Sequence, residues 1–150
     1  EKRMEITTEG GLDLISQFDR LESICHQLND NGLRISLFIE PDLRQIETAV
    51  KLKVPVIELH TGTYSELEAD NKENELKRIQ RAVDYANELG IECHAGHGLN
   101  FENVGPIASI EKITELNIGH FLIGEAVFIG LTSAIGKMKH IMAEARKVDV

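Results

Sequence analysis

The sequence predicts an α/β protein in which helices alternate with the strands of a parallel sheet. Segments with apolar residues at every third or fourth position alternate with short apolar runs along the 150 residues. Glycine or proline stands at most boundaries between these segments. The predicted order is one helix followed by four strands separated by helices, and such alternation is typical of a parallel sheet covered by helices.

The first half of the chain supplies two of these strands. Apolar residues recur through residues 12–28 with the spacing of a helix, and Asn31-Gly32 is a typical end for it. Residues 34–40 are predicted to be the first strand, and Pro41-Asp42 begins a second helix. Residues 56–60 then form the second strand.

The second half supplies two more strands and the remaining helices. Residues 61–72 are polar and are predicted to be a loop, and residues 73–89 form a long amphipathic helix. Residues 91–95 are predicted to be the third strand and residues 116–123 the fourth, with a short helical piece at residues 104–110 between them. The N-cap of the final helix is predicted at Thr132 or Ser133.

Two architectures agree with this order, and the pattern alone leaves both open. A complete doubly wound sheet fits the length of the chain. A whole (β/α)₈ barrel does not fit, because about 250 residues are typical, but four strands would make half of one. The chain begins at Glu1 and not at Met, which agrees with the expectation that the first half of such a barrel is missing from it. The sequence shows no linker, low-complexity tract or second domain.

Composition and charge argue against several classes of function. The net charge is −9 and lysine and arginine do not cluster, so nucleic acid is not an expected partner. No run of about 18 apolar residues exists, so no membrane span is expected. Cys25 and Cys93 fit neither a disulfide framework nor a zinc site, and they suggest a reducing, cytoplasmic location. The histidines lack the spacing of metal ligands, so no metal is expected.

Glu58 and His60 are the first candidate site residues. Side chains alternate along a strand, so these two share one face while Ile57 and Leu59 share the other. A carboxylate and an imidazole on a buried face are costly unless they are paired or used. In a barrel this face would line the lumen, near the mouth where catalysis takes place. The alternative is a structural ion pair between Glu58 and a lysine or arginine of a neighbouring strand. His94 is expected to be an ordinary strand residue.

Glycine-flanked histidines accompany the last two predicted strands. Gly96 and Gly98 free the backbone around His97, whose imidazole can give or take a proton near neutral pH. The Gly98 N–H has no Cβ beside it and can approach a phosphate closely. Gly119, predicted inside the fourth strand, would offer similar access together with the backbone N–H of His120. We therefore expect a phosphate-binding enzyme site on the rim of the sheet, which needs no basic surface.

Five separate segments, spread over essentially all 150 residues, match one known family in their order and spacing. Together they are more specific than any single motif. They are EKR with TTEGGLD (1–3 and 7–13), SLFI (36–39), IELHTG (57–62), AGHGL (95–99) and LNIGH (116–120). Together they resemble the pyridoxine 5′-phosphate synthase family, the ring-closing enzymes of one vitamin B6 pathway.

The resemblance implies a fold, a reaction and partners. The fold is a (β/α)₈ or TIM barrel, of which residues 1–150 form the C-terminal part of a single domain, from the end of strand four to the final helix. The reaction is that of a transferase that condenses 1-deoxy-D-xylulose 5-phosphate with 3-amino-2-oxopropyl phosphate, forming pyridoxine 5′-phosphate, phosphate and water. The family needs no metal or organic cofactor, and its members form a homo-oligomer, commonly an octamer.

The resemblance also implies roles for individual residues. His97 would be the general acid, and Glu58 would stabilise charge in the transition state. Thr7 would contact the deoxyxylulose phosphate, and the aminooxopropyl phosphate would be held by Gly98, Gly119 and His120. The family's other catalytic histidine and glutamate and its arginine ligands belong to the first half of the barrel, so the fragment 1–150 alone is expected to be inactive.

Two other functions are weighed against this one. Another phosphate-binding barrel enzyme, a lyase or isomerase, would gain support from a Schiff-base lysine at a strand end, but Lys53 precedes Pro55 and no predicted strand ends in lysine. A non-enzymatic doubly wound binding domain would need acidic residues clustered at strand ends, and here the acidic residues are spread along the chain.

Overall fold

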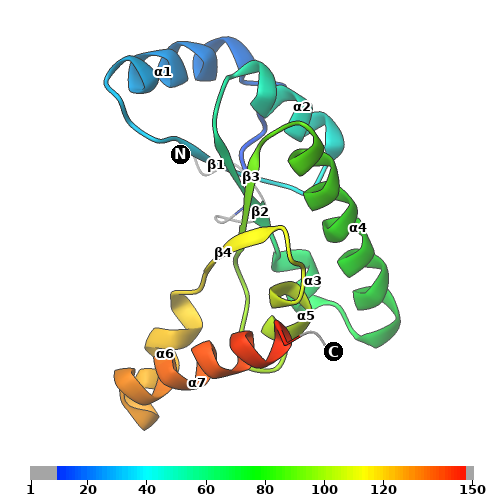
Figure 1. Ribbon diagram of the computed structural model, residues 1–150, viewed down its shortest axis with the longest axis vertical. Helices are drawn as coiled ribbons and strands as arrows, with labels where there is room; N and C mark the ends of the chain where they lie inside the picture. Colours follow the sequence, from blue (N-terminus) through cyan, green and yellow to red (C-terminus); the bar gives the residue numbers. More distant parts are fainter. Residues whose placement is uncertain (1–9, 148–150) are drawn as a thin grey trace.

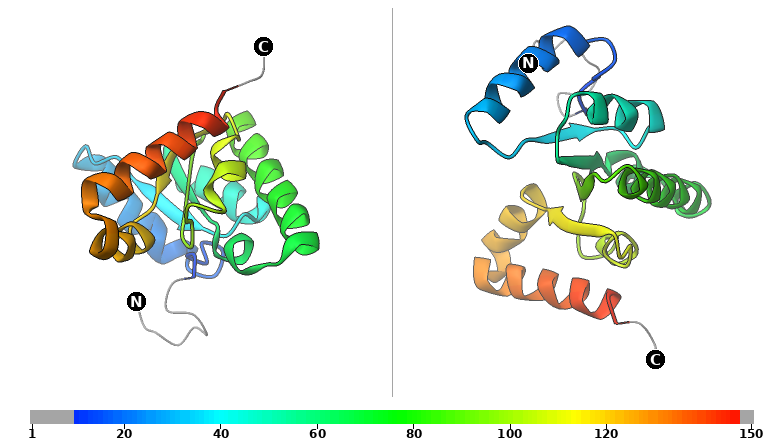
Figure 2. Two further views of the ribbon diagram at one scale, coloured as in Figure 1. Left: turned by 90° about the horizontal axis from the view of Figure 1, so that it is seen from below. Right: turned by 45° about the horizontal axis from the view of Figure 1, so that its top comes forward.

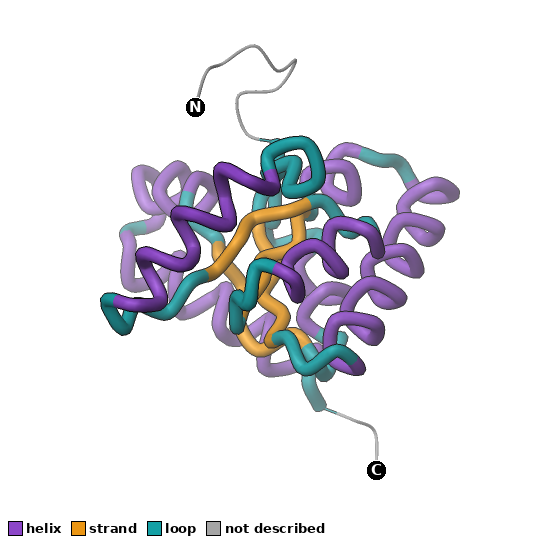
Figure 3. The backbone as a smooth tube through the Cα atoms, turned by 90° about the horizontal axis from the view of Figure 1, so that it is seen from above, coloured by secondary structure: helices purple, strands orange, loops and turns teal. Residues whose placement is uncertain are grey.

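The computed structural model describes residues 10–147, and at its centre lies a four-stranded parallel sheet in the order β1-β2-β3-β4 (Figure 1). The strands are β1 (Ser36–Ile39), β2 (Val56–His60), β3 (Glu92–Gly96) and β4 (Ile113–Asn117). Every neighbouring pair is parallel, and helices lie outside the strands (Figure 3). The α/β class and the alternation of strands with helices are thus confirmed.

Three helices cover one face of the sheet (Figures 1 and 2). They are α2 (Leu43–Lys51), α4 (Ala69–Glu88) and α5 (Val104–Ala108). The strand side chains Ile57 and Leu59 are fully buried in the same core as Ile46 of α2 and Ile79 of α4. Burial of apolar surface stabilises this layer by about 25 cal/mol per Å². This packing fixes the direction in which the opposite face of each strand points.

The opposite face of the sheet is polar, and its residues lie in rows set by the strand register. One row contains Phe38, Glu58, His94 and Glu115. The next row towards the carboxyl ends contains His60, Gly96 and Asn117. The predicted alternation along β2 is confirmed, because Glu58 and His60 are only partly buried on this face.

The remaining helices lie at the ends of the sheet. α1 (Phe18–Asp30) lies beyond β1, and α3 (Gly62–Glu66) follows β2. α6 (His120–Ile129) and α7 (Leu131–Ala145) pack against each other beyond β4, and α7 also packs on α5 (Figure 1). Within residues 10–147, no helix is both long and apolar enough to cross a membrane.

The first helix begins at Phe18, later than its apolar spacing predicts. The Leu12 N–H donates to the Phe38 carbonyl at 2.8 Å, and the Leu14 N–H donates to the Gln45 side chain at 2.8 Å. These hydrogen bonds use backbone groups that a helix would need. The segment before Phe18 therefore stays beside β1 and α2.

Residues 61–72 do not form the predicted loop, because they contain α3 and the first turn of α4. Tyr64 explains the difference: its side chain is buried, and its hydroxyl donates to the Asn103 carbonyl at 2.9 Å. Tertiary packing of this kind stabilises short helices that local composition does not favour.

The fourth strand lies at Ile113–Asn117, so its prediction at residues 116–123 is wrong. Ile113 is fully buried and pairs with Cys93, which places the strand earlier in the chain. The apolar run that follows forms α6, and a short apolar run by itself does not distinguish a strand from a helix. Gly119 is consequently the N-cap of α6 and not a residue inside a strand.

The final helix begins after a glycine. Gly130, with a φ of 82°, is its N-cap, whereas Thr132 and Ser133, the predicted caps, lie inside α7. Glycine adopts this left-handed conformation without a steric penalty, so the chain reverses between α6 and α7 at a single residue.

Replacement of Ile79 by alanine tests the packing of α4 on the sheet. Ile79 is fully buried, so Ile79→Ala should lower the free energy of unfolding by about 2–5 kcal/mol. Lys77→Ala in the same helix is the control, because its exposed i,i+4 pair with Glu73 contributes roughly 0.3–0.5 kcal/mol. Urea denaturation of the full-length protein measures both, and equal losses would contradict this packing.

Candidate active site

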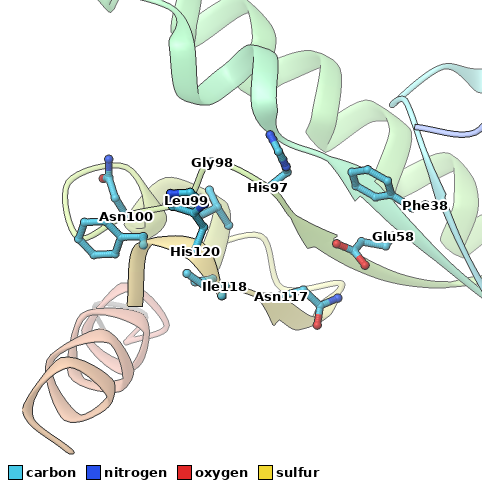
Figure 4. A pocket seen from close by; sticks show the side chains of 11 residues that line it. Phe38, Glu58, His97, Gly98, Leu99, Asn100, Asn117, Ile118 and His120 are labelled. Carbon is cyan, nitrogen blue, oxygen red and sulfur yellow. The ribbon is translucent and has the colours of Figure 1, made fainter. Parts of the chain in front are cut away.

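A pocket of about 680 Å³ opens at the carboxyl ends of the strands (Figure 4). Its walls come from Phe38 and Glu58 on the sheet, residues 97–100 after β3, and Asn117 at the end of β4 with residues 118–121 that follow it. The structure thus brings together five of the predicted site residues, which are Glu58, His97, Gly98, Gly119 and His120. Figure 4 shows Glu58 and Phe38 on the opposite side of the pocket from His120. Thr7 lies outside the described residues.

His97 follows β3 in a left-handed backbone conformation, with a φ of 85°. This conformation is unfavourable for a residue other than glycine by roughly 1–2 kcal/mol, so other contacts must maintain it. The buried Thr61 provides them, because its hydroxyl lies 2.7 Å from the Gly96 carbonyl oxygen and 2.6 Å from that of His97. The Thr61 N–H also donates to the Gly96 carbonyl at 2.8 Å. His97 therefore reaches the pocket from a firmly held backbone.

Asn103 holds the loop that follows His97. Its side-chain N–H donates to the Gly98 carbonyl at 3.1 Å, and its side-chain oxygen accepts from the Asn100 N–H at 2.7 Å. Gly98 has a φ of 74°, and a Cβ there would lie 2.7 Å from Ser65 Oγ. Only glycine fits this position without strain, and Gly98 consequently lines the pocket with backbone atoms alone.

Glu58 extends from β2 across Gly96 of β3. A Cβ at Gly96 would collide with Glu58 Oε1, so the missing side chain makes room for the carboxyl group. Burial raises the pKa of Glu58 above its ordinary value, and a hydrogen bond from the Asn117 side chain opposes that shift. The main groups that shift this pKa include no lysine or arginine, so the described residues give no support to the structural ion pair weighed above.

His94 has charged neighbours that its position in the sequence did not indicate. Its buried ring places Nε2 2.9 Å from Glu92 Oε1 and Nδ1 3.5 Å from Glu115 Oε1. His94 pairs with Glu58 in the strand register, and its positive form lowers the pKa of Glu58. His94 is therefore part of the electrostatic environment of Glu58. We had expected only an ordinary strand residue at this position.

The N-terminus of α6 faces the same pocket, with Gly119 as its N-cap and His120 as its first residue. The first backbone N–H groups of a helix have no partner within it, and the helix dipole adds partial positive charge there. In many barrel enzymes, loops after the last two strands and the N-terminus of a short extra helix bind phosphate. The loop at Gly98 and the start of α6 line one pocket.

Sequence reasoning missed some residues of the pocket. Asn117 was noticed only as part of the glycine-bearing segment, and its place beside Gly96 depends on the true register of β4. The apolar lining residues Phe38, Leu99, Ile118 and Phe121 carry no signal that separates them from core residues. Within the described part of the chain, no group of three or more histidine, cysteine, aspartate or glutamate side chains is placed to hold a metal ion.

Fold and pocket define the class of protein. Parallel βα units with a polar pocket at the carboxyl ends of the strands are the arrangement with which α/β proteins bind small ligands. Over residues 1–144 the chain matches the family described as pyridoxal phosphate biosynthesis protein PdxJ, and it belongs to that family.

Curated relatives of the chain share one name, pyridoxine 5′-phosphate synthase. The chain is 56% identical over 149 residues to the relative from Zymomonas mobilis, 50% over 147 residues to that from Sulfurihydrogenibium sp. and 52% over 151 residues to that from Rhodospirillum rubrum. These alignments cover 99%, 98% and 100% of the chain, but 58%, 60% and 61% of the three relatives. The chain thus spans about three fifths of their length.

Truncation of Asn103 should loosen the loop after His97. Asn103→Ala removes two side-chain hydrogen bonds, each of which contributes about 0.5–1.5 kcal/mol. Amide hydrogen exchange at residues 98–100 of the full-length protein should become roughly tenfold faster. Glu102→Ala, at the exposed neighbouring position, is the control. Exchange rates that stay the same in Asn103→Ala would show that the loop is held by other contacts.

Glu58→Gln should stabilise the protein in a pH-dependent way. Burial raises the pKa of Glu58, so the folded state binds this proton more tightly than the unfolded chain. The penalty of ionising Glu58 is absent below the unfolded pKa and grows as the pH rises through the folded pKa. The gain in Tm of Glu58→Gln over the wild type should therefore be larger at neutral than at acidic pH. A gain that decreases with rising pH would refute the raised pKa.

Proposed function

We propose that the protein containing this chain condenses 1-deoxy-D-xylulose 5-phosphate with 3-amino-2-oxopropyl phosphate, forming pyridoxine 5′-phosphate, phosphate and water. The family and the shared name of the relatives support an enzyme of pyridoxine biosynthesis. The observation that carries the proposal is the pocket in which Glu58, His97 and the N-terminus of α6 converge. Condensation of two phosphorylated substrates requires anion binding beside groups that transfer protons.

We infer that residues 1–150 are the C-terminal part of one (β/α)₈ barrel domain. The four strands follow one another in consecutive order, and α2, α4 and α5 cover the same face. A doubly wound sheet instead reverses its strand order and carries helices on both faces. In a barrel the polar face with Glu58 and His94 would line the lumen. The greater length of the relatives leaves room for the other strands.

His97 and Glu58 would carry the chemistry that lies within this chain. Schiff-base formation, dehydration and ring closure need repeated proton transfers, and a positioned acid or base accelerates such a step roughly 10²–10⁴-fold. His97, at the end of β3, would be the general acid. Glu58, whose carboxyl reaches over Gly96 into the pocket, would stabilise charge in the transition state. Further acid–base groups would come from the first half of the barrel.

The phosphate groups of the substrates would provide binding energy away from the reacting carbons. Gly98, Gly119 and His120 would hold 3-amino-2-oxopropyl phosphate, largely through backbone N–H groups at the loop and the start of α6. Thr7 would contact 1-deoxy-D-xylulose 5-phosphate. Proton transfers suffice for this chemistry, so the proposal includes neither a metal nor an organic cofactor.

The proposal extends to the assembly of the protein. α6 and α7 expose a group of large apolar side chains, which are Ile123, Val127, Phe128, Ile129, Leu131 and Ile135. Exposed apolar patches mark surfaces that other polypeptide covers. We propose that the first half of the barrel and further copies of the chain provide this cover, in a cytoplasmic homo-oligomer.

His97→Asn in the full-length protein tests the assignment of the acid. Asparagine keeps a polar side chain of smaller size but cannot transfer a proton near neutral pH, so turnover should fall roughly 10²–10⁴-fold. Formation of pyridoxine 5′-phosphate from the two substrates is the measurement. His140→Asn, at an exposed position on α7, should leave turnover unchanged. Full turnover in a folded His97→Asn protein would refute the proton-transfer role.

A further inference from the structure

We propose that His60 is a positioning residue for His97 and that Glu40 holds His60 in place. The inference rests on the proposed function, because it gives a purpose to the orientation of a proton-transferring His97. His60 is the last residue of β2, and its ring does not line the pocket. Its influence on a substrate would therefore act through its neighbour.

The rings of His60 and His97 pack against each other in a tilted arrangement. Their centroids are 4.7 Å apart, and the ring planes are tilted by 30°. The His60 ring also contacts the Phe38 ring in an edge-to-face arrangement. Their centroids are 5.0 Å apart, and the angle between the ring planes is 74°. The His60 side chain is 11% exposed, so little freedom remains for its ring. A ring packed in this way restricts the directions that the His97 ring can take.

Gly62, the first residue of α3, packs against the rings of both His60 and His97. A Cβ at this position would lie 2.6 Å from His60 Cε1 and 2.9 Å from His97 Cδ2. Both rings thus occupy the space that a side chain would need. Gly62 is buried, and the histidine pair packs directly on its backbone.

Glu40 connects this pair to the outer helix α4. His60 Nδ1 lies 2.9 Å from Glu40 Oε1, which is an ion-pair distance, although the geometry is not that of a hydrogen bond. The interaction with His60 is the largest cause that holds the pKa of Glu40 below its ordinary value. On its other side, Glu40 Oε2 lies 3.5 Å from Arg78 Nη2, and Arg78 is itself held at 2.6 Å by Glu75.

The backbone at His97 explains why such support matters. Glycine lies on both sides of His97, so neither neighbour in the chain has a side chain that could pack against its ring, and its own φ is positive. A misplacement of about 1 Å in a catalytic group can lower a rate about 10²-fold. Packing against His60 contributes to the orientation of the His97 ring.

Two substitutions in the full-length protein test this role from opposite directions. His60→Ala removes the supporting ring. Gly62→Ala keeps both rings but displaces them, because the added Cβ would lie 2.6 Å from His60 Cε1. Each should lower kcat about ten- to a hundredfold and leave KM within about threefold. Glu40→Gln, at a half-exposed position, should change kcat in the same direction by a smaller factor, and His140→Ala is the control.

NMR of the His97 ring provides a readout that does not depend on turnover. The Cδ2–Hδ2 signal of His97, identified by its loss in His97→Asn, should shift in His60→Ala and in Gly62→Ala but not in His140→Ala. An unchanged signal in both variants, or a kcat that matches the wild type, would overturn the positioning role. Shifted signals in a protein whose wild type forms no pyridoxine 5′-phosphate would support the positioning role while the proposed function fails.

Discussion

The geometry of the pocket depends on one buried hydroxyl group. Thr61, directly after β2, lies within hydrogen-bond distance of the carbonyl oxygens of both Gly96 and His97 at the end of β3. This contact ties two neighbouring strand ends together. It also maintains the left-handed backbone of His97, which persists only where surrounding structure holds it. The direction of the following loop, and with it the place of Gly98, follows from the same contact.

Glycines at three positions let polar side chains come close to this point. A side chain at Gly62 would collide with His60 and His97, one at Gly96 with Glu58, and one at Gly98 with Ser65. Glycine at these positions therefore does more than loosen the chain, because its missing Cβ provides the space that a neighbouring side chain fills. A chain of contacts joins α4 to the pocket: Arg78 of α4 contacts Glu40, Glu40 contacts His60, and His60 packs against His97.

The polar face of the sheet lowers stability where it serves the pocket. Glu58 lies half-buried in a row where an apolar side chain would be more favourable, and burial raises its pKa. His94 and Asn117 partly offset that penalty, because both favour the ionised carboxyl group. Conflict between local stability and placement of a charged group is typical of functional sites. The fully apolar helix-covered face of the same strands compensates for it.

Patterns that repeat within a few residues were enough to predict the α/β class, the bounds of β2 and the alternation of Glu58 with Leu59, and five segments spread along the chain were enough to predict the family. They could not predict that residues 116–123 divide between β4 and α6, because a short apolar run fits both structures. Nor could they predict the neighbours of His94 or the hydrogen bond between Asn117 and Glu58. These contacts join different strands, so they depend on a register that packing across the whole sheet decides. Side-chain periodicity is local in the chain, whereas the pocket exists only where separate strand ends meet.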